Sequence, residues 1–314
     1  MTGGDPFAWL PGRLAIAGVQ VGVWQDARAR TGVTALILPE GTAGGVDAAG
    51  GAPATRETDL LRPDNLVRGP DAIVFTGGSA PGLAAADGVV AHLQAQGRGV
   101  RVGTVRVPIV VAAALFDLTV GEPRSPGPAE GAAAAHAARP GEAGVPEGPA
   151  GAGAGATVAK LSGAGRPAGQ GAVTVCAPDG LRVGALAVVN AVGSVIGPDG
   201  QVLVGEQAAD GTPLDPLAAW ADGEPGAPSG RAHTTLVAVV TDAALDKAAL
   251  RRVARMAHDG LARALEPVHT LWDGDIVVAL ATGSAPPADA SRVGALAARA
   301  VAVAIRRSVR TAPG

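Results

Sequence analysis

The chain has 314 residues and 47% of them are hydrophobic, which is enough for a sizeable core and excludes a chain that is disordered throughout. The formal net charge of −3 is small and no run of Lys or Arg occurs, so we expect neither nucleic acid nor an anionic membrane as a partner. A single cysteine, no apolar leader and no long uninterrupted apolar run favour a cytoplasmic protein that does not span a membrane.

The predicted elements are mostly strands. Short β-type runs lie at 14–24, 33–39, 71–78, 105–118, 171–177, 181–193, 234–242 and 275–283, and helical periodicity is clearest at 82–97, 246–267 and 289–310. Because strands outnumber helices without alternating strictly with them, the pattern favours an α+β fold. Many strands are apolar on both faces, which predicts two stacked sheets covered by helices.

Two stretches look like loops. Residues 121–156 are rich in Gly, Pro and Ala and predict a long surface excursion, and residues 206–233 predict a second one. An exposed linker of this kind is where a chain can be cut without unfolding the rest. We expect one domain over 1–314, with a cut that would leave fragments 1–233 and 234–314.

Two hydroxyl residues, Thr234 and Thr235, stand where the second loop enters an apolar strand. The simplest interpretation is that threonine is β-branched and suits the start of a strand. The alternative is that the chain cuts itself between His233 and Thr234. Thr234 would then be an N-terminal nucleophile whose own α-amine, with a pKa near ~8, serves as the base.

Four further side chains could support such chemistry. Asp273 and Asp275 are two apart, so in an extended chain their carboxylates share one face and attract a cation; two solvated aspartates in a turn are the simpler interpretation of that spacing. Lys160 follows a stretch of small residues and could lose part of its hydration, which would lower its pKa. Asn190 lies within an apolar run, where its carboxamide either joins two strands or faces an oxyanion.

Other patterns fit less well. Ser79 in FTGGSAPG lacks the second glycine of a serine elbow, because Pro81 stands there. His269 could join Asp273 and Asp275 around a metal, but no second histidine accompanies it, so we expect neither metal nor cofactor. The remaining histidines are most simply surface residues: His92, His136 and His258.

Seven stretches in order resemble the L-aminopeptidase/D-amino-acid esterase family, which includes β-aminopeptidases and 6-aminohexanoate (nylon) oligomer hydrolases. They are GGAPATRETDLLRP (50–63), FTGGSAPGLAAADGV (75–89), PIVVAAALFDL (108–118), GAGAGATVAK (151–160), VVNAVG (188–193), HTTLVAVVTDAAL (233–245) and MAHDGLARALEPVHTLWDGDIVVALATG (256–283). The resemblance implies a four-layer αββα sandwich of the N-terminal-nucleophile type. It also implies a self-processing amide hydrolase that forms homotetramers of cut protomers and acts on small peptide-like amides.

Carried over by position, the resemblance makes Thr234 the nucleophile and Lys160 its activator. It places Asn190 in the oxyanion hole and lets Asp273 and Asp275 orient the threonine and its amine. This sequence departs from the family pattern at three positions: His233 stands where the family typically has Asn or Gly, Phe116 where some members have a tyrosine in the substrate pocket, and Pro81 where an aromatic is often found in the turn.

The substrate is less specified than the chemistry. Phe116 and Trp272 are the aromatic candidates for lining the substrate pocket, and the low aromatic content suggests an aliphatic ligand. Two other functions remain open at this stage. One is an acyltransferase of the ornithine-acetylating type, and the other is an uncut, non-catalytic binding protein.

Overall fold

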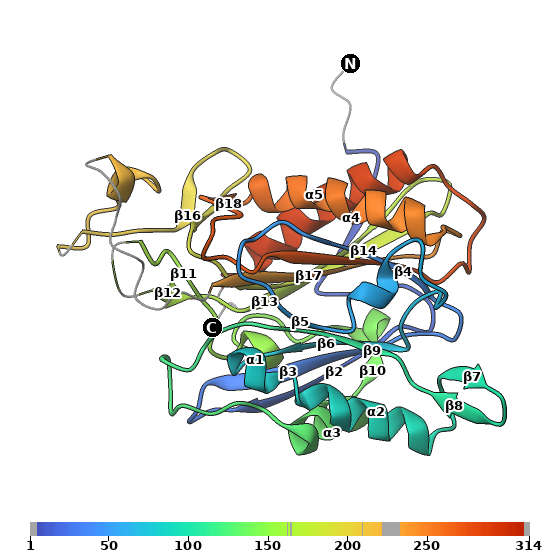
Figure 1. Cartoon of the computed structure of the whole chain (residues 1–314). Helices are drawn as coiled ribbons and strands as arrows, with labels where there is room; N and C mark the ends of the chain where they lie inside the picture. Colours follow the sequence, from blue (N-terminus) through green and yellow to red (C-terminus); the bar gives the residue numbers. More distant parts are fainter. Residues whose placement is uncertain (1–4, 162, 164, 209, 222–232, 311–314) are drawn as a thin grey trace.

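The structure is a computed structural model that describes residues 5–161, 163, 165–208, 210–221 and 233–310. Two six-stranded sheets lie face to face, and a pair of helices covers the outer face of each (Figure 1). The expected four-layer α+β sandwich is therefore confirmed. None of the helices in these described ranges is long and apolar enough to cross a membrane.

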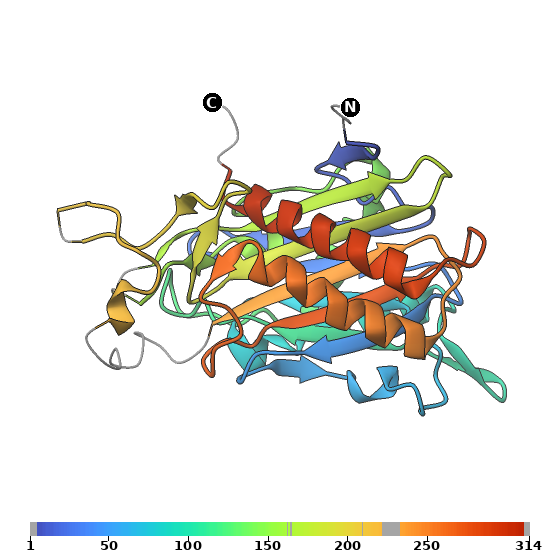
Figure 2. The same cartoon turned by 90° about the horizontal axis from the view of Figure 1, so that it is seen from above.

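The upper sheet combines four strands from the C-terminal half of the chain with two strands from the first 48 residues. Its strand order is β1 (Ala8–Pro11), β13 (Gln170–Cys176), β14 (Arg182–Asn190), β17 (Thr234–Thr241), β19 (Ile276–Ala281) and β4 (Ala43–Ala48). The long helices α4 (Lys247–Ala262) and α5 (Ala290–Ser308) lie across it side by side (Figure 2). Each begins at an aspartate, Asp246 or Asp289, whose carboxylate accepts a hydrogen bond from the first turn.

The lower sheet is built from the N-terminal half. Its strand order is β10 (Arg139–Pro140), β2 (Gln20–Asp26), β3 (Thr31–Ile37), β6 (Ala72–Thr76), β9 (Val110–Ala114) and β5 (Ala54–Arg56), and helices α2 (Ala85–Ala95) and α3 (Pro128–His136) cover it. The smaller elements are α1 (Ser79–Gly82), β7 (Val100–Val102), β8 (Val105–Val107), β11 (Thr157–Val158), β12 (Arg166–Pro167), β15 (Ser194–Ile196), β16 (Val202–Val204), β18 (Leu265–Glu266) and four 3-10 helices at Asp59–Leu61, Gly141–Ala143, Gly151–Gly153 and Ala218–Trp220.

Three apolar layers explain why the strands are hydrophobic on both faces. In β17, Leu236, Ala238 and Val240 face the space between the sheets, while Val237 and Val239 face α4 and α5. Successive side chains of a strand point to opposite faces, so a strand in a four-layer fold must be apolar throughout.

The expected surface excursion at 121–156 is wrong for much of its length. Helix α3 lies within it and packs against α2 and the lower sheet, with Ala134 and Ala135 buried. Its last part, 151–156, is also largely buried, because small residues let this segment approach β3 closely. Low sequence complexity here reflects tight packing rather than exposure.

The second predicted loop has a short 3-10 helix at Ala218–Trp220, and its residues 209 and 222–232 lie outside the described ranges.

Candidate active site

Strand β17 begins at Thr234, and its pairing places this residue opposite Asn190. Strands β14 and β17 are antiparallel, with Asn190 and Thr234 as the last register pair. On the other side β17 runs parallel to β19, where continuous pairing starts at Leu236 and Ile276 and an isolated bridge joins His233 to Asp273. The first residues of β17 thus lie between the end of β14 and the loop that precedes β19.

The hydroxyl of Thr234 lies beside the carbonyl group of the preceding residue. Thr234 Oγ1 donates to the backbone oxygen of His233 at 2.5 Å, and the backbone N–H of Gly274 donates to the same oxygen at 2.6 Å. His233 itself is held by its N–H, which donates to the carbonyl of Trp272 at 3.0 Å. Both Thr234 and His233 are buried.

Lys160 reaches this site from the segment after β11. Its Nζ donates to the backbone oxygen of Asn190 at 3.1 Å and to Asn190 Oδ1 at 2.8 Å. Only 7% of Lys160 is exposed, and this burial lowers its pKa to about 7 although Asp273 and Asp117 act in the opposite direction. The expected loss of hydration at Lys160 is confirmed.

The carboxamide of Asn190 is fully enclosed and oriented by its neighbours. Besides Lys160, its Oδ1 accepts the N–H of Thr157 at 3.0 Å, and its Nδ2 donates to the carbonyl of Phe116 at 3.0 Å. The side-chain nitrogen of asparagine carries two hydrogens, and the carbonyl of Phe116 accepts one of them. The side chain therefore links three chain segments around the end of β14.

Asp273 and Asp275 are both 1% exposed, so the interpretation as two solvated turn residues is wrong. Asp273 accepts the N–H of Val192 at 3.1 Å through Oδ1, and the N–H and hydroxyl of Thr270 through Oδ2 at 3.2 and 2.6 Å. Burial, followed by repulsion from Asp275, raises the pKa of Asp273 to about 6.

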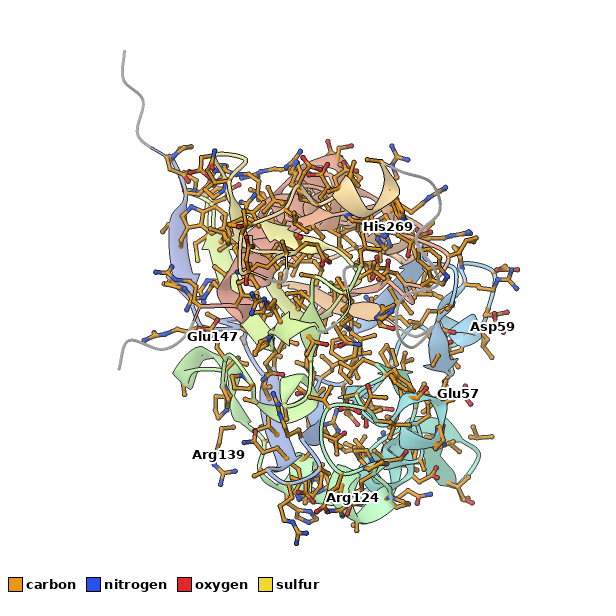
Figure 3. All side chains as sticks on the ribbon, turned by 90° about the vertical axis from the view of Figure 1, so that its left-hand side faces the viewer. Glu57, Asp59, Arg124, Arg139, Glu147 and His269 are labelled. Atoms are coloured by element: carbon orange, nitrogen blue, oxygen red, sulfur yellow. The ribbon has the colours of Figure 1, made fainter. Side chains whose placement is uncertain are left out.

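Asp275 anchors the start of β17. Its Oδ1 accepts the N–H of Thr235 at 2.7 Å, and its Oδ2 accepts from the N–H and Nδ1 of His269 at 3.1 and 2.8 Å. Figure 3, which views the molecule from the left-hand side of Figure 1, labels His269 in the upper part of the fold.

A glycine pair lets a neighbouring loop close over these aspartates. The N–H of Ala52 donates to the carbonyl of Asp273 at 2.8 Å. A side chain on Gly50 would meet that same oxygen at 2.3 Å, and one on Gly51 would meet the backbone of Leu271 at 2.7 Å. The motif at 50–63 begins with two glycines because no larger residue fits there.

The five residues singled out from the sequence therefore converge on one place. Lys160, Asn190, Thr234, Asp273 and Asp275 are linked by direct contacts or through the backbone groups next to them. The aromatic candidates contact the same residues through their backbones: the carbonyl of Phe116 accepts from Asn190, and the carbonyl of Trp272 accepts from His233. The ring of Trp272 lies 6.4 Å from the ring of Trp220.

Three groups escaped the sequence analysis. Asp117 is 1% exposed, accepts the N–H of Gly78 at 2.8 Å, and has a pKa that burial raises to about 6. Its signal was FDL, an acidic residue directly after an apolar strand. His258, expected at the surface, is buried beside His269. The backbone N–H of Gly274 carries no side-chain signal at all.

The chain is similar in sequence to proteins named as aminopeptidases and as a 6-aminohexanoate-oligomer hydrolase. Over 284 residues the chain is 44% identical to an uncharacterized aminopeptidase of Mycobacterium tuberculosis, which covers 86% of this chain and 80% of that protein. It is 31% identical over 280 residues to the 6-aminohexanoate-oligomer endohydrolase of Agromyces sp., which covers 86% and 74%.

Solved structures share the fold. The β-aminopeptidase of Burkholderia sp. superposes with a TM-score of 0.69 at 23% identity, over 96% of this chain and 88% of that one. An L-aminopeptidase D-Ala-esterase/amidase of Ochrobactrum anthropi, described as a variant of the Ntn hydrolase fold, superposes with a TM-score of 0.67 at 20% identity, over 95% and 85%.

Fold and relatives together define a hydrolase of peptide or amide bonds with the N-terminal-nucleophile fold. Residues 14–313 match the model of peptidase family S58, so the chain belongs to that family.

Proposed function

We propose that this hydrolase matures by cutting its own chain between His233 and Thr234, leaving fragments 1–233 and 234–314 that remain one folded domain. The observation that carries this proposal is the position of the Thr234 hydroxyl beside the His233 carbonyl, whose oxygen also receives the Gly274 N–H. A hydroxyl in that place is next to the carbon it must attack. A backbone N–H on the oxygen can stabilise the negative charge that develops there.

The cutting reaction then proceeds in two steps. Thr234 Oγ1 bonds to the carbonyl carbon of His233 as the C–N bond breaks, and the hydroxyl proton passes through Lys160 to the departing nitrogen. The product is an ester between His233 and Thr234 with a free α-amine. Water hydrolyses this ester, which leaves a carboxylate on His233 and restores the hydroxyl of Thr234.

Lys160 is suited to the proton transfer because its pKa of about 7 leaves part of it neutral at neutral pH. The adjacent carboxylates of Asp273 and Asp275 would hold the new α-ammonium, since paired buried carboxylates favour a neighbouring cation.

Turnover repeats the same chemistry on a substrate. The Thr234 hydroxyl attacks the amide carbonyl, the amine part leaves with a proton, and water hydrolyses the acyl-enzyme ester. We assign the second N–H of Asn190 to the oxyanion, because Phe116 takes only one of its two hydrogens. Phe116 and Trp272 would form the apolar walls for a short aliphatic amide.

As substrates we propose peptides with a free amino end or oligomers of 6-aminohexanoate, and the names of the relatives, an aminopeptidase and a 6-aminohexanoate-oligomer endohydrolase, support this proposal. We further propose a cytoplasmic homotetramer of cut protomers; the single cysteine supports the compartment, and the family resemblance supports the assembly.

Mass spectrometry of the purified protein tests the proposal. We expect fragments that end at His233 and begin at Thr234, and a single uncut chain for Thr234→Ala. Turnover is then measured on L-, D- and β-amino acid p-nitroanilides and on aminohexanoate oligomers. The proposal would be overturned if the wild-type protein stays uncut and hydrolyses these amides, and if the Thr234→Ala variant hydrolyses them equally fast.

A further inference from the structure

At the start of β17 the Asp275 side chain takes the place of a backbone hydrogen-bond acceptor. Continuous backbone pairing between β17 and β19 begins at Leu236 and Ile276, and an isolated bridge joins His233 to Asp273 before it. Between the two, the N–H of Thr235 bonds to a side chain instead of the backbone on that side. The Asp275 carboxylate fills the place, accepting that N–H at 2.7 Å. After a cut at 233–234, Thr235 would be the first residue with a backbone N–H anchored on the β19 side.

The other oxygen of Asp275 is held by one residue through two bonds. His269 donates to Oδ2 from its backbone N–H and from Nδ1, which fixes the rotation of the carboxylate. His269 adopts φ +57°, a left-handed conformation that is costly for most residues and tolerated best by Gly and Asn. His269 thus places a side-chain N–H donor at a position where glycine would relieve the backbone strain.

A second histidine fixes the ring of the first. The rings of His258 and His269 lie 4.8 Å apart at 78°, in an edge-on contact. His258 is buried, and its Nε2 lies 3.1 Å from the carbonyl oxygen of Asp47, so this nitrogen carries the proton. The chain of contacts therefore runs from Asp47 on β4, through both rings and Asp275, to Thr235.

We infer that His269 is a positioning residue for the nucleophile: through Asp275 it holds the N–H of Thr235 and so sets where the Thr234 hydroxyl lies. This inference rests on the proposed function, and it assigns no contact between His269 and substrate. Hydrogen bonds to a charged group contribute enough that losing this one corresponds to roughly 10- to 100-fold in rate if it misplaces the hydroxyl.

Two substitutions at His269 separate the donor from the backbone conformation. His269→Asn keeps an N–H near the position of Nδ1, and His269→Gly removes it; both residues tolerate the positive φ. We expect His269→Gly to slow self-cleavage by at least about tenfold, and His269→Asn to restore most of the rate. Equal rates in the wild type and His269→Gly, or equally slow rates in both variants, would overturn the inference.

A matched control exists on the opposite side of the molecule. His136 and His92 form an edge-on ring pair with the same 78° angle, but Nδ1 of His136 bonds to the carbonyl of Ala132. His136→Asn therefore removes an imidazole of similar geometry with no link to Asp275. It should cleave at the wild-type rate, and slowing equal to that of His269→Gly would contradict a specific role for His269.

A readout that needs no cleavage separates this inference from the proposed function. In the Thr234→Ala background, which lacks the proposed nucleophile, amide hydrogen exchange at Thr235 reports the Asp275 anchor directly. We expect exchange at Thr235 to accelerate about tenfold or more with His269→Gly and to recover with His269→Asn. Unchanged exchange would overturn the inference even if the wild-type chain cuts itself, and a faster rate would support it even if that chain stays uncut.

Discussion

Lys160 and Asn190 are joined by two hydrogen bonds, because Nζ of the lysine donates to both the backbone and the side-chain oxygen of the asparagine. Thr234 lies directly across from Asn190 in the neighbouring strand. A single buried amine is thus held against the residue that faces the nucleophile. Its partly neutral state makes it the base in the proposed cleavage, and the first predictions follow from that position.

Lys160→Met should abolish most self-cleavage. The substitution keeps an unbranched side chain of similar length in the buried site but removes the amine, and general-base catalysis typically contributes about 10²- to 10⁴-fold. The measurement is the fraction of cut chain against time after purification at pH 8. Cleavage at the wild-type rate would show that the proton goes elsewhere.

The other lysine provides the control. Lys247, also largely buried, donates to the carbonyls of Leu60 and Asn65 at 2.8 and 2.7 Å and holds that loop against the first turn of α4. Lys247→Met should therefore lower the melting temperature without slowing self-cleavage. The two substitutions separate loss of a buried lysine from loss of the base.

Asn190→Asp should move the acid side of the pH profile. A carboxylate at the place of Oδ1 would lie next to the Lys160 ammonium and raise the pKa of Lys160 by about 1–3 units. The pH at which self-cleavage reaches half its maximal rate should rise by a similar amount.

Asn190→Ala is the companion variant, because it loses the bond to Phe116 without adding charge. It should slow self-cleavage with no shift of the acid side to higher pH. An Asn190→Asp profile that stays in place would argue against Lys160 as the titrating base.

Much of the fold was readable from hydrophobic patterning. The helices predicted at 246–267 and 289–310 correspond to α4 and α5, since an aspartate cap and a three-four apolar spacing mark each. The strand predicted at 105–118 is divided, because Pro108 has no N–H to continue a ladder and separates β8 from β9. Helix α3 was not predicted, because its alanines and glycine resemble the composition of a linker.

The sequence predicted site residues where the residue type is rare in this chain. Lys160 and Asn190 stand out in a chain with only two lysines and two asparagines, although the other pair, Lys247 and Asn65, serves to hold a loop. The burial of Asp273 was not readable, since it depends on a loop from residues 49–52 that closes over it. Contacts between distant segments leave no local pattern.

The pKa shifts at the site predict opposite trends of stability with pH. Lys160 has a pKa of about 7 when folded and 10.5 in the reference state, so the unfolded chain binds more protons between these values and the free energy of unfolding rises with pH across that window. Asp117, with a pKa of about 6 against 3.8, acts in the other direction: its contribution falls as pH rises from about 4 to 6.

The Lys160 trend can be isolated in the Thr234→Ala background. The free energy of unfolding of Thr234→Ala minus that of Thr234→Ala/Lys160→Met should increase from pH 7 to pH 9, by up to about 1.4 kcal/mol for each pH unit. Urea denaturation at pH 7, 8 and 9 provides the measurement. A difference that stays constant would mean that Lys160 is protonated throughout this range.

Gly274→Ala should slow self-cleavage through a direct steric effect. A Cβ on Gly274 would lie 2.8 Å from Thr234 Oγ1 and 2.7 Å from the carbonyl oxygen of Ala52. The backbone oxygen cannot move away cheaply, so the hydroxyl and the 274 N–H must separate from the His233 carbonyl. Because misplacement of a reacting group by about 1 Å lowers the rate by as much as about 100-fold, we expect cleavage to slow by about that factor.

Gly127→Ala is the control, because the nearest atom to its added Cβ is a glutamate oxygen at 3.4 Å, and this variant should cleave normally. Rapid cleavage by Gly274→Ala would remove the Gly274 N–H from the proposed oxyanion site.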